Sequence, residues 1–307
     1  MDTILLPGRT APTGMGWLPD RPDVRDLTHE SPEIKEILGK SGSKALRSLA
    51  ATSAADTDSG ELPATTDLRE WFSPVEDQEQ IGSCTANAAC GMVEYYQRRT
   101  FGKYIDMSRL FVYKVTRQYL GLTGDTGAYL RSVMGALALF GAPPEKYWPY
   151  ETAKFEDDPP AFAFAFAQNY QALTYFRLDP AGQSGEDTLT VVKSHLASGI
   201  PAIFGFTVYA TIRKPKKAGD IPYPAKNETV LGGHAIVAVG YDDNRTVTNP
   251  SDGNTQTGAF LIRNSWGTTW GEEGYGWLPY EYVRQGLAED WWAMTSAEWV
   301  ETAAFDE

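Results

Sequence analysis

The sequence predicts an α+β protein in which helices come first along the chain and strands come second. Three stretches between about residues 84 and 140 repeat apolar residues at helical spacing, and after about residue 168 the chain is rich in β-branched and aromatic residues. Its 307 residues, 42% of them hydrophobic, are enough for one large domain or for two lobes that each have a core. Because the two kinds of element occupy separate parts of the chain, we expect two lobes.

The first 61 residues differ in composition from the rest. Residues 17–26 form a charged segment broken by prolines, and a short helix is expected after it, with Ser31 as the N-cap and Pro32 as the first helical residue. Residues 40–61 are rich in Ser, Ala, Gly, Thr and Asp, a composition typical of linkers. We therefore predict an N-terminal arm or possible pro-segment with its linker over residues 1–61. A domain over 62–307 follows, with one lobe at about 62–160 and the other at about 161–307.

The helices are predicted from apolar spacing and from signals at their ends. Residues 84–99 repeat small and apolar residues at intervals of three and four, and two arginines near the end suit the negative end of the helix dipole. Residues 108–119 and 129–140 form two further helices, the second ending at Gly141 before two prolines. The segment 161–167 alternates Ala and Phe, which leaves helix and strand both open.

The second half is predicted to be mostly strand. One helix interrupts it over 186–198 and ends at Gly199. The strands are expected at residues 170–178, 202–209, 234–241 and 259–263.

The chain is acidic, with a formal net charge of −13 and a pI of about 4.8. Because such a chain repels phosphate backbones, we expect no nucleic-acid partner, and the basic run at 213–217 is interpreted as a solvated loop. No apolar run reaches the length of a membrane span, and residues 1–9 lack the basic region of a Sec signal peptide. We therefore predict no membrane partner and a cytoplasmic location, or export by a non-Sec route.

Two cysteines, Cys84 and Cys90, lie on the first of these helices. Six helical positions separate their Cα atoms by about 9 Å, which exceeds the roughly 7 Å that a disulfide can span, so no disulfide is expected between them and at least one thiol is free. Cys84 follows a Gly-Ser pair at the helix start, where unpaired N–H groups and the dipole lower the pKa of a thiol. Cys90 lies on the apolar stripe and is expected to be buried.

Among the three histidines, His234 is the candidate general base. It follows two glycines at the start of an apolar strand, about 150 positions after Cys84. His29 lies in the N-terminal arm. His195 lies near the end of the helix over 186–198, where a position at the surface is expected.

Two amide side chains complete the predicted constellation. Asn264 ends a strand, and its amide oxygen can hold one imidazole nitrogen so that the other faces the sulfur, with Trp266 covering that hydrogen bond. Gln78, six residues before Cys84, can donate from its amide to a developing oxyanion. Gln80 competes with Gln78 for this role.

These blocks resemble the motifs of papain-like cysteine peptidases over about residues 62–280, and in particular those of bacterial, xylellain-like members. The cysteine block reads Gln-Glu-Gln-Ile-Gly-Ser-Cys and ends at Cys84. The histidine block reads Gly-His-Ala at 233–235, and the asparagine block reads Asn-Ser-Trp-Gly at 264–267. The chain departs from the family pattern at Ile81, Thr85, Ala128 and Gly233, where relatives often have cysteine, tryptophan, glycine and an acidic residue.

The resemblance implies a left, mainly helical lobe that carries Cys84 and a right, β-barrel-like lobe that carries His234 and Asn264, with the active-site cleft between them. Cys84 would be the nucleophile, poised as an ion pair with His234 as general acid and base. Asn264 would orient the imidazole, and Gln78 would be the oxyanion donor. The resemblance also implies substrate-binding positions at Gly82, Ser83, Gly127, Ala128, Gly233, Ala235 and Trp266.

The predicted function is that of a cysteine endopeptidase that hydrolyses peptide bonds in peptide or protein substrates through a thioacyl intermediate, without metal or cofactor. Two alternatives stay open: a thiol acyltransferase or deamidase on the same fold, and a papain-fold binding protein without catalysis. The role of the arm is left open as well. Residues 17–26 either dock on or near the cleft as an inhibitory segment, as in a zymogen, or pack elsewhere.

Overall fold

The computed structural model of the chain describes residues 2–41, 46–47, 62–168 and 174–295. Its helices are α1 (Pro32–Gly39), α3 (Cys84–Phe101), α4 (Arg109–Tyr119), α5 (Leu130–Phe140), α6 (Ala161–Ala167), α7 (Gly185–Ala197) and α8 (Glu281–Arg284). Its strands are β1 (Asp2–Ile4), β2 (Thr13–Met15), β3 (Trp17–Leu18), β4 (Thr65–Asp67), β5 (Ala128–Tyr129), β6 (Thr174–Arg177), β7 (Ala202–Tyr209), β8 (Val230–Thr248), β9 (Thr255–Arg263), β10 (Tyr275–Pro279) and β11 (Ala288–Thr295). Short 3-10 turns lie at Arg69–Trp71, Glu145–Tyr147, Thr152–Lys154 and Ala210–Arg213.

The predicted helices form one half of the molecule. Helices α3, α4 and α5 pack on one another, and each starts within a residue of the predicted position. The Ser108 hydroxyl accepts from the Phe111 N–H at the start of α4, and Gly141 ends α5 with a positive φ. The ambiguous segment 161–167 is helix α6, because its two buried alanines, Ala163 and Ala167, are one helical turn apart.

The other half is an antiparallel sheet with the strand order β10-β9-β8-β7-β11-β6, on which β4 pairs with β8. The strands predicted at 202–209, 234–241 and 259–263 are β7 and parts of β8 and β9. Residues 174–177 of the fourth predicted strand form β6, and its first residues, 170–173, lie outside the described residues. β10 and β11 were not expected from the sequence, because their short apolar runs show no clear alternation.

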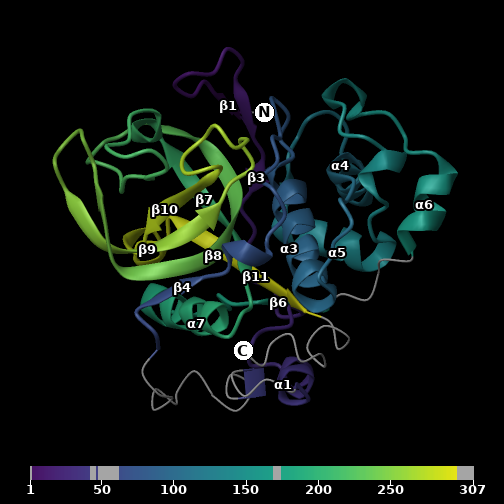
Figure 1. Cartoon of the computed structure of the whole chain (residues 1–307), viewed down its shortest axis with the longest axis horizontal. Helices are drawn as coiled ribbons and strands as arrows, with labels where there is room; N and C mark the ends of the chain where they lie inside the picture. The colour runs from purple at the N-terminus through teal and green to yellow at the C-terminus, as the bar shows by residue number, and fades with distance from the viewer. Residues whose placement is uncertain (1, 42–45, 48–61, 169–173, 296–307) are drawn as a thin grey trace.

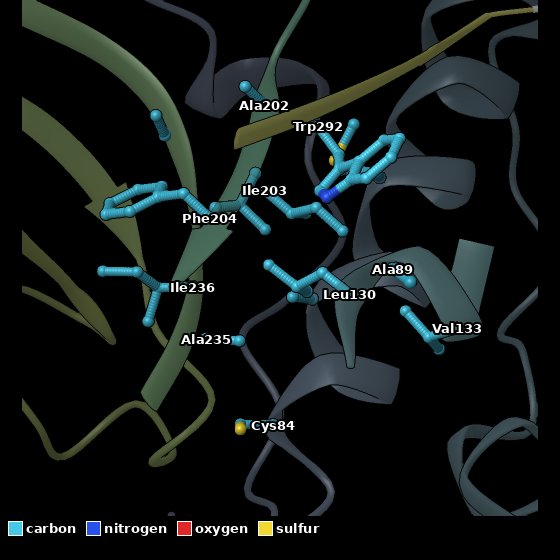
Figure 2. Close-up of a cluster of buried hydrophobic side chains, with 14 of the residues drawn as sticks. Cys84, Ala89, Leu130, Val133, Ala202, Ile203, Phe204, Ala235, Ile236 and Trp292 are labelled. Carbon is cyan, nitrogen blue, oxygen red and sulfur yellow. The ribbon is translucent and has the colours of Figure 1, made fainter. Parts of the chain in front are cut away.

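The two halves meet along α3. Figure 1 shows the sheet on the left and the helices on the right, and α3 packs against β7 and β8. Figure 2 shows the buried cluster between them, in which Leu130 of α5 lies between Ile203 of β7 and Val133 of α5. Cys84 lies at one end of this cluster, on the side of Ala235 of β8. The helix start that carries the thiol is therefore held against the strand that carries His234.

The N-terminal arm, residues 2–29, runs between the two halves (Figure 1). It begins as the antiparallel hairpin β1–β2, and its strand β3 pairs in parallel with β5. Helix α1 follows with Ser31 as its N-cap, but the Ser31 hydroxyl accepts from the Thr28 N–H and not from an N–H of the helix. The side chain of Ser31 therefore stabilises the turn that leads out of the arm.

The basic run at 213–217 lies on the surface, as predicted, with the side chains of its cationic residues exposed. Within the part of the chain that the structure describes, no helix is both long enough and apolar enough to span a bilayer.

Candidate active site

Cys84 is the first residue of α3 and is completely buried. The Gly16 N–H of the arm donates to its sulfur at 3.3 Å, and the backbone N–H of Ala235 on β8 also lowers the pKa of the thiol. Burial nevertheless raises the pKa of the thiol to about 11, and these N–H groups offset only part of the increase. The expectation of a lowered pKa at the helix start is therefore wrong for this conformation, because the arm keeps water from the sulfur.

His234 is held from two sides. Its Nε2 lies 2.8 Å from Asn264 Oδ1, and the Trp266 ring stacks on the imidazole with centroids 4.5 Å apart. Its Nδ1 is buried and has no hydrogen-bond partner among the described residues. Burial lowers the pKa of His234 to about 4, and the bond to Asn264 opposes this shift.

Thiol and imidazole are therefore both neutral near pH 7 in this conformation, and the predicted ion pair of Cys84 and His234 is absent. The cause is the same for both residues: each is buried under the arm and each charged form would lose its solvation. Both cysteines, Cys84 and Cys90, are free and buried; the absence of a disulfide between them and the burial of Cys90 were predicted from the sequence, and the burial of Cys84 was not.

Gln78, the predicted oxyanion donor, is buried, and its amide is already engaged in hydrogen bonds. Nε2 donates to the carbonyl oxygens of Gly14 at 2.9 Å and Ile81 at 3.0 Å, while Oε1 accepts from the Ser265 hydroxyl at 2.6 Å. The competing Gln80 is exposed and donates to Thr152. Of the two glutamines, Gln78 alone faces the arm across the buried site.

The arm crosses the site on glycines. A β-carbon on Gly14 would lie 2.3 Å from the Ile81 carbonyl oxygen, and one on Gly16 would lie 2.0 Å from the Gly82 carbonyl oxygen. The Gly16 carbonyl accepts from the Ala128 N–H at 2.9 Å. No side chain larger than hydrogen fits at Gly14 or Gly16, so the arm lies in van der Waals contact with the strip of backbone beside Cys84.

Trp17, the next residue, fills a pocket in the sheet-bearing half. Its indole is almost fully buried and lies where side chains at Gly205 and Gly233 would otherwise be. The indole Nε1 donates to Oδ2 of the buried Asp290 at 3.1 Å. Asp290 was not predicted as a site residue; an acidic residue directly before two tryptophans, in a mostly buried strand, was the available signal.

The seven expected substrate-binding residues divide into three groups. The Ser83 hydroxyl turns into the helical half, 2.6 Å from the Tyr150 hydroxyl, so the structure does not bring its side chain to the others. The backbone N–H of Ala235 lies close enough to Cys84 to lower the pKa of the thiol, and Trp266 covers His234. The remaining four lie against the arm residues Gly16 and Trp17: Gly82, Gly127, Ala128 and Gly233.

Beyond Trp17 the arm is fastened by two arginines. Arg131 of α5 pairs with Asp20 and Asp26 of the arm and also donates to the Arg21 carbonyl oxygen. Arg177 of β6 is buried, and its backbone exchanges hydrogen bonds with Leu27 and His29. Residues 17–26 are therefore packed against the body of the protein, with Trp17 beside Gly233.

His195 is buried, which corrects the expected surface position. Its Nδ1 lies 2.8 Å from the Val191 carbonyl oxygen, and its ring meets His29 of the arm edge-on with centroids 6.2 Å apart. The arm therefore covers this histidine, which the sequence of α7 alone could not reveal.

Comparisons with known proteins identify the family of the chain. The model of the papain family of cysteine proteases matches residues 62–293. The chain is 33% identical over 228 residues to an uncharacterized peptidase C1-like protein of Acanthamoeba polyphaga mimivirus, covering 71% of this chain and 68% of the relative. It is 27% identical over 225 residues to cathepsin K of Gallus gallus, but spans only 59% of that protein.

Among solved structures, xylellain, a cysteine protease from Xylella fastidiosa, superposes with a TM-score of 0.68 at 32% identity, covering 95% of this chain and 99% of that one. Procathepsin L 3 of Tenebrio molitor, at 20% identity and a TM-score of 0.57, shares the fold. The chain therefore belongs to the papain family of cysteine proteases.

Proposed function

We propose that the protein is an endopeptidase that cleaves peptide bonds through a thioacyl intermediate on Cys84, and that its arm keeps it latent. One observation carries the proposal: Asn264 holds Nε2 of His234 at 2.8 Å, while Nδ1 is left without a partner in the same buried site as Cys84. An imidazole fixed at one nitrogen can exchange a proton at the other.

The chemistry follows from these positions. When the arm leaves, His234 Nδ1 takes the thiol proton and the Cys84 sulfur attacks the substrate carbonyl carbon. The Gln78 amide and the Cys84 N–H stabilise the oxyanion that forms. The carbon–nitrogen bond then breaks, and the imidazolium gives its proton to the leaving amine. Water, deprotonated by His234, hydrolyses the thioester and restores the thiol.

The contacts of the arm support latency. The Gln78 amide, which an oxyanion would need as a donor, already donates to the Gly14 carbonyl oxygen. The Gly16 N–H donates to the Cys84 sulfur. The group bonded to the sulfur is an amide N–H, so this contact gives the thiol no carbonyl carbon to attack. A substrate therefore competes with the arm for the Gln78 amide and for access to the Cys84 sulfur, and turnover requires the arm to move.

The test compares two cysteines on one helix. In a chain opened by Gly16→Ala, we expect Cys84→Ala to abolish hydrolysis of an internally quenched peptide, whereas Cys90→Ala retains it. A peptide ester should give a burst of leaving group equal to one per Cys84, as expected for an acyl intermediate. The wild-type chain should hydrolyse the peptide more slowly than Gly16→Ala.

Several outcomes would contradict the proposal. Loss of activity in Cys90→Ala with retention in Cys84→Ala would remove Cys84 as the nucleophile. Release of ammonia from glutamine peptides without chain cleavage would favour the deamidase. Equal rates for the wild-type and Gly16→Ala chains would end the latency proposal and leave the peptidase intact.

A further inference from the structure

We infer that Asp290 selects the substrate: the pocket that Trp17 fills takes a long substrate side chain that ends in an N–H donor, as arginine and tryptophan do. This inference rests on the proposed peptidase function, because it concerns what the same site accepts once the arm has left. It begins from the arm itself, which shows what the pocket can hold.

The pocket fits a long, flat side chain. Trp17 is 6% exposed, and β-carbons on the two wall glycines, Gly205 and Gly233, would lie 1.8 Å and 2.9 Å from its indole atoms. Glycine at both wall positions leaves room for a ring or a guanidinium plane beside the sheet. Smaller residues would leave the pocket partly empty, which forfeits contacts.

The floor of the pocket is a carboxylate with one oxygen turned toward the occupant. Asp290 is completely buried; its Oδ1 accepts from the Trp292 indole at 2.7 Å and pairs with Arg177 at 3.1 Å. Its Oδ2 accepts from Trp17. When the arm leaves, Oδ2 loses this donor while Oδ1 keeps both of its partners, so a buried oxygen faces the vacated pocket and favours an occupant that can donate.

The pocket lies next to the reacting sulfur. Trp17 follows Gly16, whose N–H is 3.3 Å from Cys84 Sγ, and the wall residue Gly233 precedes His234. The Ala128 N–H holds the main chain at Gly16. A substrate residue within two positions of the scissile bond therefore reaches the pocket with its side chain, and this agrees with the expected place of Gly233 beside the S2 region.

Apolar side chains of similar size are disfavoured. Phenylalanine or leucine would fill the space but leave Oδ2 buried without a donor, and such an unpaired group costs more than the bond itself contributes. The tryptophan indole and the arginine guanidinium both supply an N–H at the end of a long body. Both side chains share a terminal N–H donor. Comparing tryptophan with arginine peptides therefore distinguishes a neutral donor from a cationic one.

The kinetic test uses the full chain carrying Gly16→Ala and peptides that differ only in the second residue before the cleaved bond. We expect kcat/KM for arginine and tryptophan peptides to exceed that for leucine and phenylalanine peptides by about tenfold. In Asp290→Asn, Arg177 and Trp292 retain the amide oxygen, so the amide N–H group faces the pocket. The preference should then vanish or reverse. Equal rates for all four peptides before this change would overturn the inference.

A second measurement does not depend on turnover. In the chain carrying Gly16→Ala and Cys84→Ala, the same peptides should compete with a fluorescent arginine peptide in the same order, and Asp290→Asn should abolish that order. Binding discrimination without any hydrolysis by the Gly16→Ala chain would defeat the proposed function and uphold this inference. Hydrolysis without discrimination between the peptides would uphold the proposed function and defeat this inference.

A third measurement uses the arm as the ligand. Trp17→Phe keeps an aromatic ring but removes the N–H donor, so the arm should open more often and Cys84 should be alkylated several times faster. Trp71→Phe, outside the pocket, is the matched control and should leave the rate unchanged. A Trp17→Phe chain that is alkylated at the wild-type rate would show that the N–H contributes nothing, and the inference would fall.

Discussion

Two segments of the arm contact the body of the protein in different ways. The crossing segment, residues 13–16, lies over the site through its backbone, and its glycines fit with no room for a β-carbon. The anchoring segment, residues 17–29, is held by side chains: Trp17 on Asp290, and two aspartates on Arg131. The first segment provides the fit over the site, and the second provides most of the charged attraction.

This difference separates blocking from holding. Hydrogen bonds between neutral groups contribute about 1 kcal/mol each, whereas bonds to charged groups contribute about 1.5–3 kcal/mol. The crossing segment has only neutral bonds or bonds to the thiol, and the anchoring segment has ion pairs. The arm can therefore be released by changes far from Cys84, which leave the catalytic groups as they are.

The largest effect is expected from a change of shape in the crossing segment. In Gly16→Ala the added carbon would lie 2.0 Å from the backbone oxygen of Gly82, which cannot move aside. Overpacking of this kind costs up to about 3 kcal/mol, or about 100-fold in the population of the open arm. We expect alkylation of Cys84 by iodoacetamide to be faster by about this factor.

Gly135→Ala in α5 is the matched control. Its added β-carbon would lie 3.4 Å from the Tyr175 hydroxyl, an ordinary contact distance, and residue 135 is helical. Its alkylation rate should equal that of the wild-type chain. If Gly16→Ala were alkylated no faster than Gly135→Ala, the crossing segment would not be the barrier to the thiol.

An intermediate effect is expected from the anchor. Arg131→Gln removes the ion pairs with Asp20 and Asp26, which are partly buried, and leaves the site itself untouched. Loss of about 2 kcal/mol would speed alkylation by roughly 30-fold. The wild-type rate should also rise with salt, whereas the Arg131→Gln rate should respond less.

Arg284→Gln, which removes an exposed pair with Glu186, is the control for the loss of a surface arginine and should change the alkylation rate little. Equal acceleration by Arg131→Gln and Arg284→Gln would show that the anchoring segment does not hold the arm in place.

The sequence predicted the elements that local rules govern. Periodicity located α3 and β7, and the motifs predicted that Asn264 would hold His234. It did not predict the raised pKa of Cys84, because that shift comes from burial of the thiol. The arm segment that buries the thiol lies about 70 residues away in the sequence.

Other features depend on long-range placement and were beyond local reasoning. The two-residue pairing of β3 with β5 has no periodicity to read, and Asp290 acquires its meaning only from Trp17, which lies at the other end of the chain. The run Thr-Gly-Met-Gly-Trp at 13–17 was the one local hint, since alternating glycines indicate close backbone approach.

The smallest effect is expected from protons on the anchor. Burial lowers the pKa of His29, and Lys35 adds to this, while Glu30 at 3.7 Å and the bond to the Arg177 backbone oppose it. A histidine with a lowered pKa in the closed form binds its proton more readily when the arm is free. Acid below about pH 6.5 therefore favours release of the arm, and above that pH His29 contributes nothing.

His29→Gln removes this proton site, so the ratio of wild-type to His29→Gln alkylation rates should rise on the order of a few-fold between pH 7.5 and 5. Taking the ratio cancels the dependence of the alkylation rate on the thiolate fraction and on the protonation of His234, which both chains share. His195, whose ring meets His29, is affected by the substitution, so its protonation is part of the measured effect. Because the buried His195 and His234 also have a lowered pKa, they push both chains toward opening in acid. A ratio that stays flat with pH would mean that His29 keeps its surroundings when the arm opens, and that the anchoring segment separates from the body only up to Asp26.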